Sequence, residues 1–299
     1  MRRHALRLAL MLGAMLLASS PLAAPKGPGF SFAVIGQLAG GSDAGLHEAL
    51  RHVEHADFIV VNGIRPRGEP CGDAMYQRRK HLLEESGKAV VIALAARDWA
   101  ECRSDSGESV AQERLNHLRG LLFDGEHAVR TKKLTLVRQS AAARFRDHPE
   151  NASWEHQRIL FATINLPSNN NHYLSAAGRN YEFEDRLVSN RAWLQRLFSQ
   201  AKRHKMRAIV LFADANPLVV PMRANNRPEK RDGFAEVRKQ LQTLAARFPG
   251  RILLVHGQPS AGGIVWRDNL GALGAGRGRI NVTVVPAANN MFRLERSLK

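Results

Sequence analysis

Three short apolar runs decide the fold that this sequence predicts: SFAVIG (residues 31–36), DFIVV (57–61) and AVVIAL (89–94). Each run has the length and composition of a buried β-strand and ends at a loop. A helical pattern begins at Asp43 after the first run, and another spans residues 73–85 after the second. Strand, loop and helix repeated in this order indicate parallel strands joined by right-handed crossovers.

The pattern continues less regularly through the rest of the chain, and the segment that holds Gly271 and Gly274 is expected to be a glycine-rich loop. The other expected helices span residues 109–122, 184–203 and 234–248, and the other expected strands span residues 134–137, 158–165, 208–212, 252–256, 263–266 and 280–285. Because the chain begins with strand–helix units and ends in strands alone, we predict an α/β fold with two packed sheets and helices outside. No break in composition divides residues 25–299, which we therefore expect to form one domain.

The composition is that of a globular protein: 299 residues, 24% charged and 44% hydrophobic, with a net charge of +17. Basic residues gather in four clusters: Lys202, Arg203, Lys205 and Arg207; Arg223, Arg227, Lys230 and Arg231; Arg277 and Arg279; Arg293, Arg296 and Lys299. Such clusters attract phosphate esters, nucleic acid or anionic lipids. No aromatic residues alternate with them as base stacking would require, so a nucleic-acid partner is not favoured.

The first 24 residues have the pattern of a secretory signal peptide. Arg2, Arg3 and Arg7 precede an apolar stretch over residues 8–17, and small residues follow up to residue 24. An uncleaved membrane anchor is the alternative, but residues 8–17 are too few to span a bilayer. We therefore expect a periplasmic or secreted protein that has no transmembrane segment once the signal is removed.

The chain contains two cysteines, Cys71 and Cys102. In an oxidising compartment two thiols usually pair, whereas a metal site would need CxxC or nearby histidine spacing, which is absent. A disulfide here would close a loop of about 30 residues and stabilise the fold by about 3–4 kcal/mol. We expect the two cysteines to be joined.

Several segments resemble the calcineurin-like metallophosphoesterase superfamily, in a secreted bacterial branch. FAVIGQ (residues 32–37) resembles its first strand, which ends in Gly-Asp, and residues 57–71 resemble its second strand, Gly-Asp motif and Ser-Gly-x-x-Pro-Cys loop. Residues 75–102 resemble the segment that ends in Gly-Asp-Asn-Asp/Glu-Trp-x-x-Cys. The resemblance continues in the same order through residues 149–171, 213–217 and 252–260. It implies the two-sheet sandwich of that superfamily.

The superfamily binds two divalent cations, which activate a water molecule through Asp, Asn and His ligands. At the matching positions of this chain most ligands are replaced. Gln37 stands at the first Asp, and Gly63 is followed by Ile64 in place of the second. The Asn of the third motif falls on Arg97, although the acid after it remains as Asp98.

The last motif of the family, His-Gly-Asp-x-His, is also reduced. His256 remains, but Gln258 and Ser260 stand at the Asp and the second His. Two cations bring four positive charges, which amides and an added arginine do not balance. The resemblance therefore implies a pocket without a dinuclear metal site, in which Arg97 and amide groups hold a phosphate-like anion.

The candidate pocket comprises nine residues at predicted strand ends: Gln37, Gly63, Arg97, Asp98, Asn169, Asn170, His256, Gln258 and Ser260. His256 and Asp98 are its remaining candidates for a metal ligand, and no catalytic residue is assigned. Purely structural roles stay open: a packed histidine at residue 256, an acid that caps a turn at residue 98, a solvated Arg97 and a polar turn over residues 169–171.

Three functions are compatible with these observations. The preferred one is an exported, non-catalytic protein of the phosphoesterase fold that binds a phosphate-like anion and needs no cofactor. The second is a metal-dependent hydrolase of phosphate esters with a rebuilt site, which would require a divalent cation. The third is a basic envelope protein whose surface binds anionic polymers or lipids. The sequence points to no particular protein partner.

Overall fold

The computed structural model describes residues 29–36, 43–53, 55–66, 68–129, 131–175, 178, 180–222, 227, 229–260, 262–276 and 278–295. The predicted signal peptide and Gln37 lie outside these residues.

The first sheet contains the three strands that the opening runs predict. Its order is β14-β13-β1-β2-β3, and β1, β2 and β3 are parallel while β13 and β14 are antiparallel additions at one edge. The strands are β1 (Phe30–Ile35), β2 (Phe58–Asn62), β3 (Ala89–Ala93), β13 (Arg279–Val284) and β14 (Phe292–Glu295). Every residue of β2 and β3 is buried, as expected for parallel strands covered on both faces.

The second sheet has the order β11-β12-β10-β9-β8-β7-β6. Within it β8, β9, β10 and β12 are parallel. The strands are β6 (Val137–Arg138), β7 (Ala152–His156), β8 (Ile159–Thr163), β9 (Ala208–Ala213), β10 (Arg251–His256), β11 (Val265–Arg267) and β12 (Leu270–Gly274). A separate two-stranded ribbon is formed by β4 (His127–Ala128) and β5 (Thr131–Thr135).

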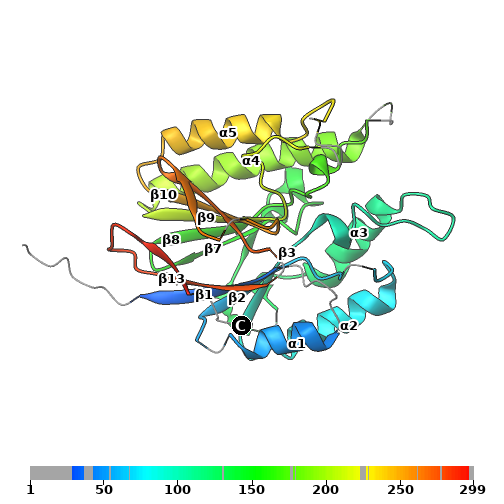
Figure 1. Ribbon diagram of the computed structural model, residues 1–299, viewed down its shortest axis with the longest axis horizontal. Helices are drawn as coiled ribbons and strands as arrows, with labels where there is room; N and C mark the ends of the chain where they lie inside the picture. Colours follow the sequence, from blue (N-terminus) through cyan, green and yellow to red (C-terminus); the bar gives the residue numbers. More distant parts are fainter. Residues whose placement is uncertain are drawn as a thin grey trace, which may run out of the picture.

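Helices cover the outer faces of both sheets, and the sheets pack against each other in the middle (Figure 1). The helices are α1 (Asp43–Arg51), α2 (Asp73–Glu84) and α3 (Ala111–Leu122) on the first sheet, and α4 (Tyr181–Arg203) and α5 (Ala235–Ala246) on the second. Short 3₁₀ turns occur at Ala96–Asp98, Gln139–Ala141, Ala143–Phe145 and Asn170–His172.

Helix α4 illustrates why these segments are helical. Its first turn carries Glu182 and Glu184 and its last turn carries Lys202 and Arg203, charges that complement the helix dipole. Its apolar stripe, which includes Trp193, is buried on the second sheet.

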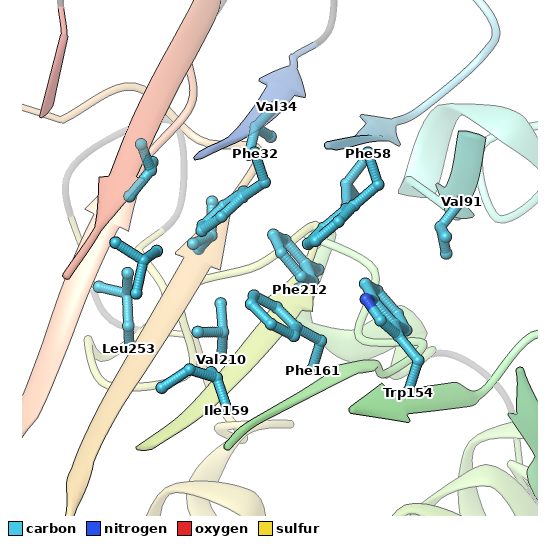
Figure 2. Close-up of a cluster of buried hydrophobic side chains, with 14 of the residues drawn as sticks. Phe32, Val34, Phe58, Val91, Trp154, Ile159, Phe161, Val210, Phe212 and Leu253 are labelled. Atoms are coloured by element: carbon cyan, nitrogen blue, oxygen red, sulfur yellow. The ribbon is translucent and has the colours of Figure 1, made fainter. Parts of the chain in front are cut away.

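Aromatic rings fill the space between the sheets (Figure 2). Phe32 and Phe58 of the first sheet stack at 5.6 Å, and Trp154 of the second stacks on Phe161 and Phe212 at 5.5 and 6.0 Å. Across the interface, Phe58 meets Phe161 edge-on at 5.0 Å. Such pairs each add about 0.5–1.5 kcal/mol beyond the burial of their surface. The predicted two-sheet sandwich is confirmed.

The structure corrects three expectations about individual strands. The segment expected to be a glycine-rich loop contains β12, and a Cβ on Gly271 would lie 2.7 Å from the Trp266 ring. Glycine therefore serves close packing there, whereas sequence pattern favours a loop. Strands β4, β7 and β14 were not expected. The strand expected over residues 134–137 is divided between β5 and β6, which belong to different sheets.

The expected disulfide is present. Cys71, just before α2, is bonded to Cys102, which follows the Ala96–Asp98 turn, and their Cα atoms lie 5.8 Å apart. No helix in the described part of the chain is long and apolar enough to cross a membrane.

Candidate functional site

The carboxyl ends of the parallel strands of both sheets meet at one edge of the sandwich. The Nδ2 of Asn62, at the end of β2, donates to the carbonyl of Ala213, at the end of β9, over 2.7 Å. In open α/β sheets this is the edge from which functional loops emerge. A functional site is therefore expected at this edge.

Asp214 joins the two sheets at the same edge. Its Oδ2 accepts hydrogen bonds from the backbone N–H of Ala96, which follows β3, at 2.7 Å, and from that of Ser168, which follows β8, at 2.8 Å. Burial raises the pKa of this carboxyl, and the two backbone donors act in the opposite direction. We call the group Asn62, Ala96, Asp98, Asp214 and Gly257 the seam.

Gly257 fits the seam because it has no side chain. A Cβ on this residue would lie 2.9 Å from Oδ1 of Asn62 and 3.0 Å from Oδ1 of Asp214. Its backbone N–H donates to the carbonyls of Ala213 and Asp214, at 3.1 and 3.0 Å. The strand ends are thus in direct contact at the seam.

Asp98 fastens the loops that follow β2 and β3. Its Oδ1 accepts from the backbone N–H of Ile64 and Arg65, at 3.0 and 2.9 Å, and its Oδ2 accepts from that of Ala95 at 2.8 Å. The side chain is fully buried, and burial raises its pKa to about 6 although these donors favour the charged form. Of the two roles left open by the sequence, this geometry is that of an acid that caps a turn.

The described residues of this edge, which do not include Gln37, do not fit a pair of divalent cations. A metal-binding carboxylate needs free oxygen lone pairs, whereas both oxygens of Asp98 and one of Asp214 already accept backbone hydrogen bonds. Among the residues that the structure describes, no three His, Cys, Asp or Glu side chains are grouped so that they could hold a metal ion.

The side chain of His256 lies on the other face of its strand. Leu253 and Val255 of β10 belong to the core between the sheets, whereas Leu254 packs under the helices, and alternation places His256 with Leu254. The imidazole is 3% exposed, and its Nδ1 has no partner among the described residues. Burial lowers its pKa to about 4, so it is neutral near pH 7.

The loop after β8 makes a left-handed turn in which Asn170 and Asn171 have φ angles of 53° and 56°. Asparagine tolerates this conformation better than most residues. The Asn170 side chain accepts from the N–H of Gly233 at 2.8 Å and donates to the carbonyl of Arg231 at 2.9 Å. Asn171 accepts from the buried guanidinium of Arg186. These bonds fix the turn against the segment that precedes α5.

A polar depression of about 360 Å³ opens between these two segments, and we call it the cleft. Asn169, Asn170, Lys230, Arg231 and Gln258 are among its lining residues, together with one carboxylate, Glu229. The Arg231 guanidinium lies 4.7 Å from the centre of the Tyr173 ring. The cleft therefore combines two cationic side chains with several amide groups.

A larger depression of about 910 Å³ lies between α5 and the β11–β12 hairpin, and we call it the apolar cavity. Its apolar wall includes Leu218, Ala245, Val265, Leu270 and Ala272. The lining also includes polar residues, namely Gln242, His256, Ser260 and Asn269, and two charged residues at its exposed border, Arg267 and Asp268.

Eight of the nine predicted site residues are described, and they do not converge on one pocket. Asn169, Asn170 and Gln258 line the cleft, and His256, Gln258 and Ser260 line the apolar cavity. Gly63, whose N–H donates to Ala93, adjoins Asn62 of the seam, which contains Asp98. Arg97 is half-buried in the Ala96–Asp98 turn, and its carbonyl accepts from the Arg65 side chain. Gln37 lies outside the described residues.

Sequence reasoning did not assign Asn62, Asp214, Lys230 or Arg231 to the site. The first two follow buried apolar runs directly, which is the one signal that could have identified them. The two basic residues belong to a recognised basic cluster, but their position opposite Asn169 depends on the fold.

Comparisons with known proteins support the fold. No family model matches the sequence, and no curated protein matches it. Among solved structures, the chain is similar to the structure of PhoD, with a TM-score of 0.53 and 10% identity over 92% of this chain and 70% of that one. It is also similar to a hypothetical protein from Thermus thermophilus, with a TM-score of 0.37 and 11% identity over 82% of this chain and 75% of that one. The likeness to PhoD shows a phosphoesterase-like α/β sandwich.

Proposed function

We propose that this protein is an exported, non-catalytic member of the phosphoesterase-like fold that binds a phosphate-like anion in the cleft. The observation that carries the proposal is the seam. At the edge where the resembled superfamily binds its metals, the buried carboxylates of this chain accept backbone hydrogen bonds and join the two sheets.

Metal binding at the seam would disrupt these bonds. If Asp98 or Asp214 turned towards a cation, buried N–H groups would lose their acceptors, at a cost of about 1–3 kcal/mol for each group. His256 could not help, because its side chain lies on the face of the sheet that α5 covers. The hydrogen-bonded form of the edge is thus the more stable one for this set of side chains.

The chemistry of the cleft suits an anion. Among the described lining residues, Lys230 and Arg231 carry two positive charges and Glu229 carries one negative charge, which leaves a net charge of +1. The amides of Asn169 and Gln258 add neutral hydrogen-bond donors. Charge-assisted hydrogen bonds to phosphate oxygens are among the stronger ones in proteins. Arg231 is already positioned by the Tyr173 ring, which lowers the entropy lost on binding.

Export is part of the same proposal. The Cys71–Cys102 disulfide is typical of proteins from oxidising compartments, and the first 24 residues have the pattern of a signal peptide. Both features support a periplasmic or secreted location.

Titration of the protein with inorganic phosphate tests the proposal when it is done once in a metal chelator and once with manganese. We expect saturable binding of the same affinity in both conditions. Absence of binding in both would contradict an anion site. Binding that requires manganese would contradict a metal-free one and favour the hydrolase.

A further inference from the structure

The cleft and the apolar cavity adjoin each other and share part of their lining. Asn216, Val219 and Gln258 line both of them. This shared wall is fixed, because Oε1 of Gln258 accepts a hydrogen bond of 2.9 Å from the backbone N–H of Asn216. A ligand that extends past these shared residues would therefore contact both the cleft and the apolar cavity.

The two parts differ sharply in chemistry. On the cleft side Lys230 and Arg231 face the amide of Asn169, whereas on the cavity side Val265 and Leu270 face α5. The volumes of about 360 and 910 Å³ are those of small-molecule sites, which usually measure about 300–1,000 Å³.

We propose that the joined cleft and apolar cavity bind one phosphate-bearing amphiphile, with its phosphate in the cleft and its hydrocarbon chain in the cavity. The phosphate half rests on the proposed function, and the inference adds the chain. The ligand class is thus a lipid phosphate, whether presented by a membrane or free as a monomer.

The polar groups of the cavity favour a hydrocarbon over a peptide. The Asn269 side chain already donates to three carbonyls, at 2.8–3.0 Å, and Oγ of Ser260 accepts from the N–H of Gly274. Arg267 and Asp268 also line the cavity, but they are exposed to solvent, so a peptide backbone in the interior would be left with unpaired polar groups.

Exposed apolar side chains border both the cleft and the apolar cavity. Val219, Val220 and Met222, between 52% and 54% exposed, follow β9, and Val265, 60% exposed, borders the cavity. Large exposed apolar groups gathered at one place typically mark a binding surface. Here Val219, which lines both the cleft and the apolar cavity, would contact the hydrocarbon chain where it passes from one to the other.

Calorimetric titration with methyl phosphate, octyl phosphate and octanol, all below the concentration at which octyl phosphate forms micelles, tests the inference. We expect octyl phosphate to bind at least tenfold more tightly than either other compound, because each buried methylene stabilises a complex by about 0.8 kcal/mol. Ala272→Phe, which fills the cavity, should reduce octyl phosphate to the affinity of methyl phosphate and leave methyl phosphate unchanged. Ala235→Phe, at the start of α5, is the matched control and should leave the affinity for octyl phosphate unchanged.

A second variant tests the apolar wall of the cavity without filling the cavity itself. Val265→Asp places a charge beside the chain on an already exposed position, so the fold should tolerate it, and it should weaken octyl phosphate tenfold. Val188→Asp, at a similarly exposed valine of α4, should not.

The outcomes separate the inference from the proposed function. If methyl phosphate binds and octyl phosphate binds no more tightly, the chain site is refuted and the anion site stands. If octanol binds as tightly as octyl phosphate, the joined site is refuted. If none of the three binds, the proposed function fails as well.

Discussion

The seam and the cleft are neighbours at one edge of the sandwich, yet their polar groups are used in opposite ways. In the seam, the buried oxygens of Asp98 and Asp214 accept backbone hydrogen bonds and leave no space between the strand ends. In the cleft, Lys230 and Arg231 line an open depression. Polar groups that satisfy one another stabilise the fold, whereas those that face open space can bind a ligand.

The seam and the cleft also differ in the sign of their charged side chains. Buried acids lie in the seam, where they hold backbone, and two cationic side chains line the cleft. A metal ion would need the acids of the seam as ligands, whereas an anion needs the cationic side chains of the cleft as hydrogen-bond donors. The proposed anion site therefore depends on the cations of the cleft and leaves the acids of the seam bonded to the backbone.

The largest effect is expected for Asp98→Ala, which removes the acceptor of three buried backbone N–H groups. We expect the free energy of unfolding to fall by about 3–6 kcal/mol in a denaturant titration. Asp105→Ala, in an exposed loop, should change it by less than about 0.5 kcal/mol. A small loss for Asp98→Ala would show that the seam does not hold the strand ends together.

The disulfide should contribute somewhat less to the free energy of unfolding than the Asp98 side chain does. Replacement of Cys71 and Cys102 together by alanine should lower the free energy of unfolding by about 3–4 kcal/mol, because the unfolded chain regains the freedom of a loop of about 30 residues. Phosphate affinity should be unchanged, because neither cysteine lines the cleft. Loss of phosphate binding in a folded double variant would contradict the separation of the two regions.

Asp98 and His256 should give opposite dependences of stability on pH. The raised pKa of Asp98 means that the folded chain binds more protons than the unfolded chain between about pH 4 and pH 6, so this contribution falls as pH rises. The lowered pKa of His256 means that the folded chain binds fewer protons between about pH 4 and pH 6.5, so this contribution rises with pH. Across its window, each group changes the free energy of unfolding by about 3 kcal/mol, at 1.36 kcal/mol per pKa unit.

Variants separate these two contributions. Relative to the unmodified protein, Asp98→Asn should make stability increase with pH across this window, and His256→Leu should make it decrease. Denaturant titrations at pH 4, 5, 6 and 7 measure both. Profiles that run parallel to that of the unmodified protein would show that neither group titrates as the structure indicates.

The smallest effect is expected at the cleft. Lys230→Ala should weaken the binding of inorganic phosphate by up to about fivefold, the scale of an exposed ion pair, and should leave the free energy of unfolding unchanged. Lys239→Ala, at an exposed lysine of α5 outside the cleft, is the matched control. Equal affinities of the two variants would place the anion elsewhere on this basic protein.

Much of the fold could be predicted from the sequence because its strands are continuous apolar runs. Residues 89–94 are an example, since β3 occupies Ala89–Ala93. β12 could not be predicted in this way, because glycine packs under Trp266 there and glycine normally indicates a loop. The order of apolar and polar residues indicates which local structure a segment prefers. It does not indicate where two strands pack so closely that only glycine fits.

The site was harder to predict than the fold. The bond from Asn62 to Ala213 joins residues 151 positions apart, and no local pattern reveals it. Asp98 was identified as a surviving acid, but its role as a turn cap depends on where three backbone N–H groups lie. The signal peptide and the anion-binding role of Arg97 stay predictions.

The most direct test of the central claim is the metal content of the purified protein, measured together with turnover of a phosphate monoester and a phosphodiester. The seam predicts less than one metal ion per chain and no turnover, with or without added manganese. Stoichiometric manganese, iron or zinc, with phosphoesterase turnover that is lost in His256→Ala, would contradict the non-catalytic account and establish the hydrolase.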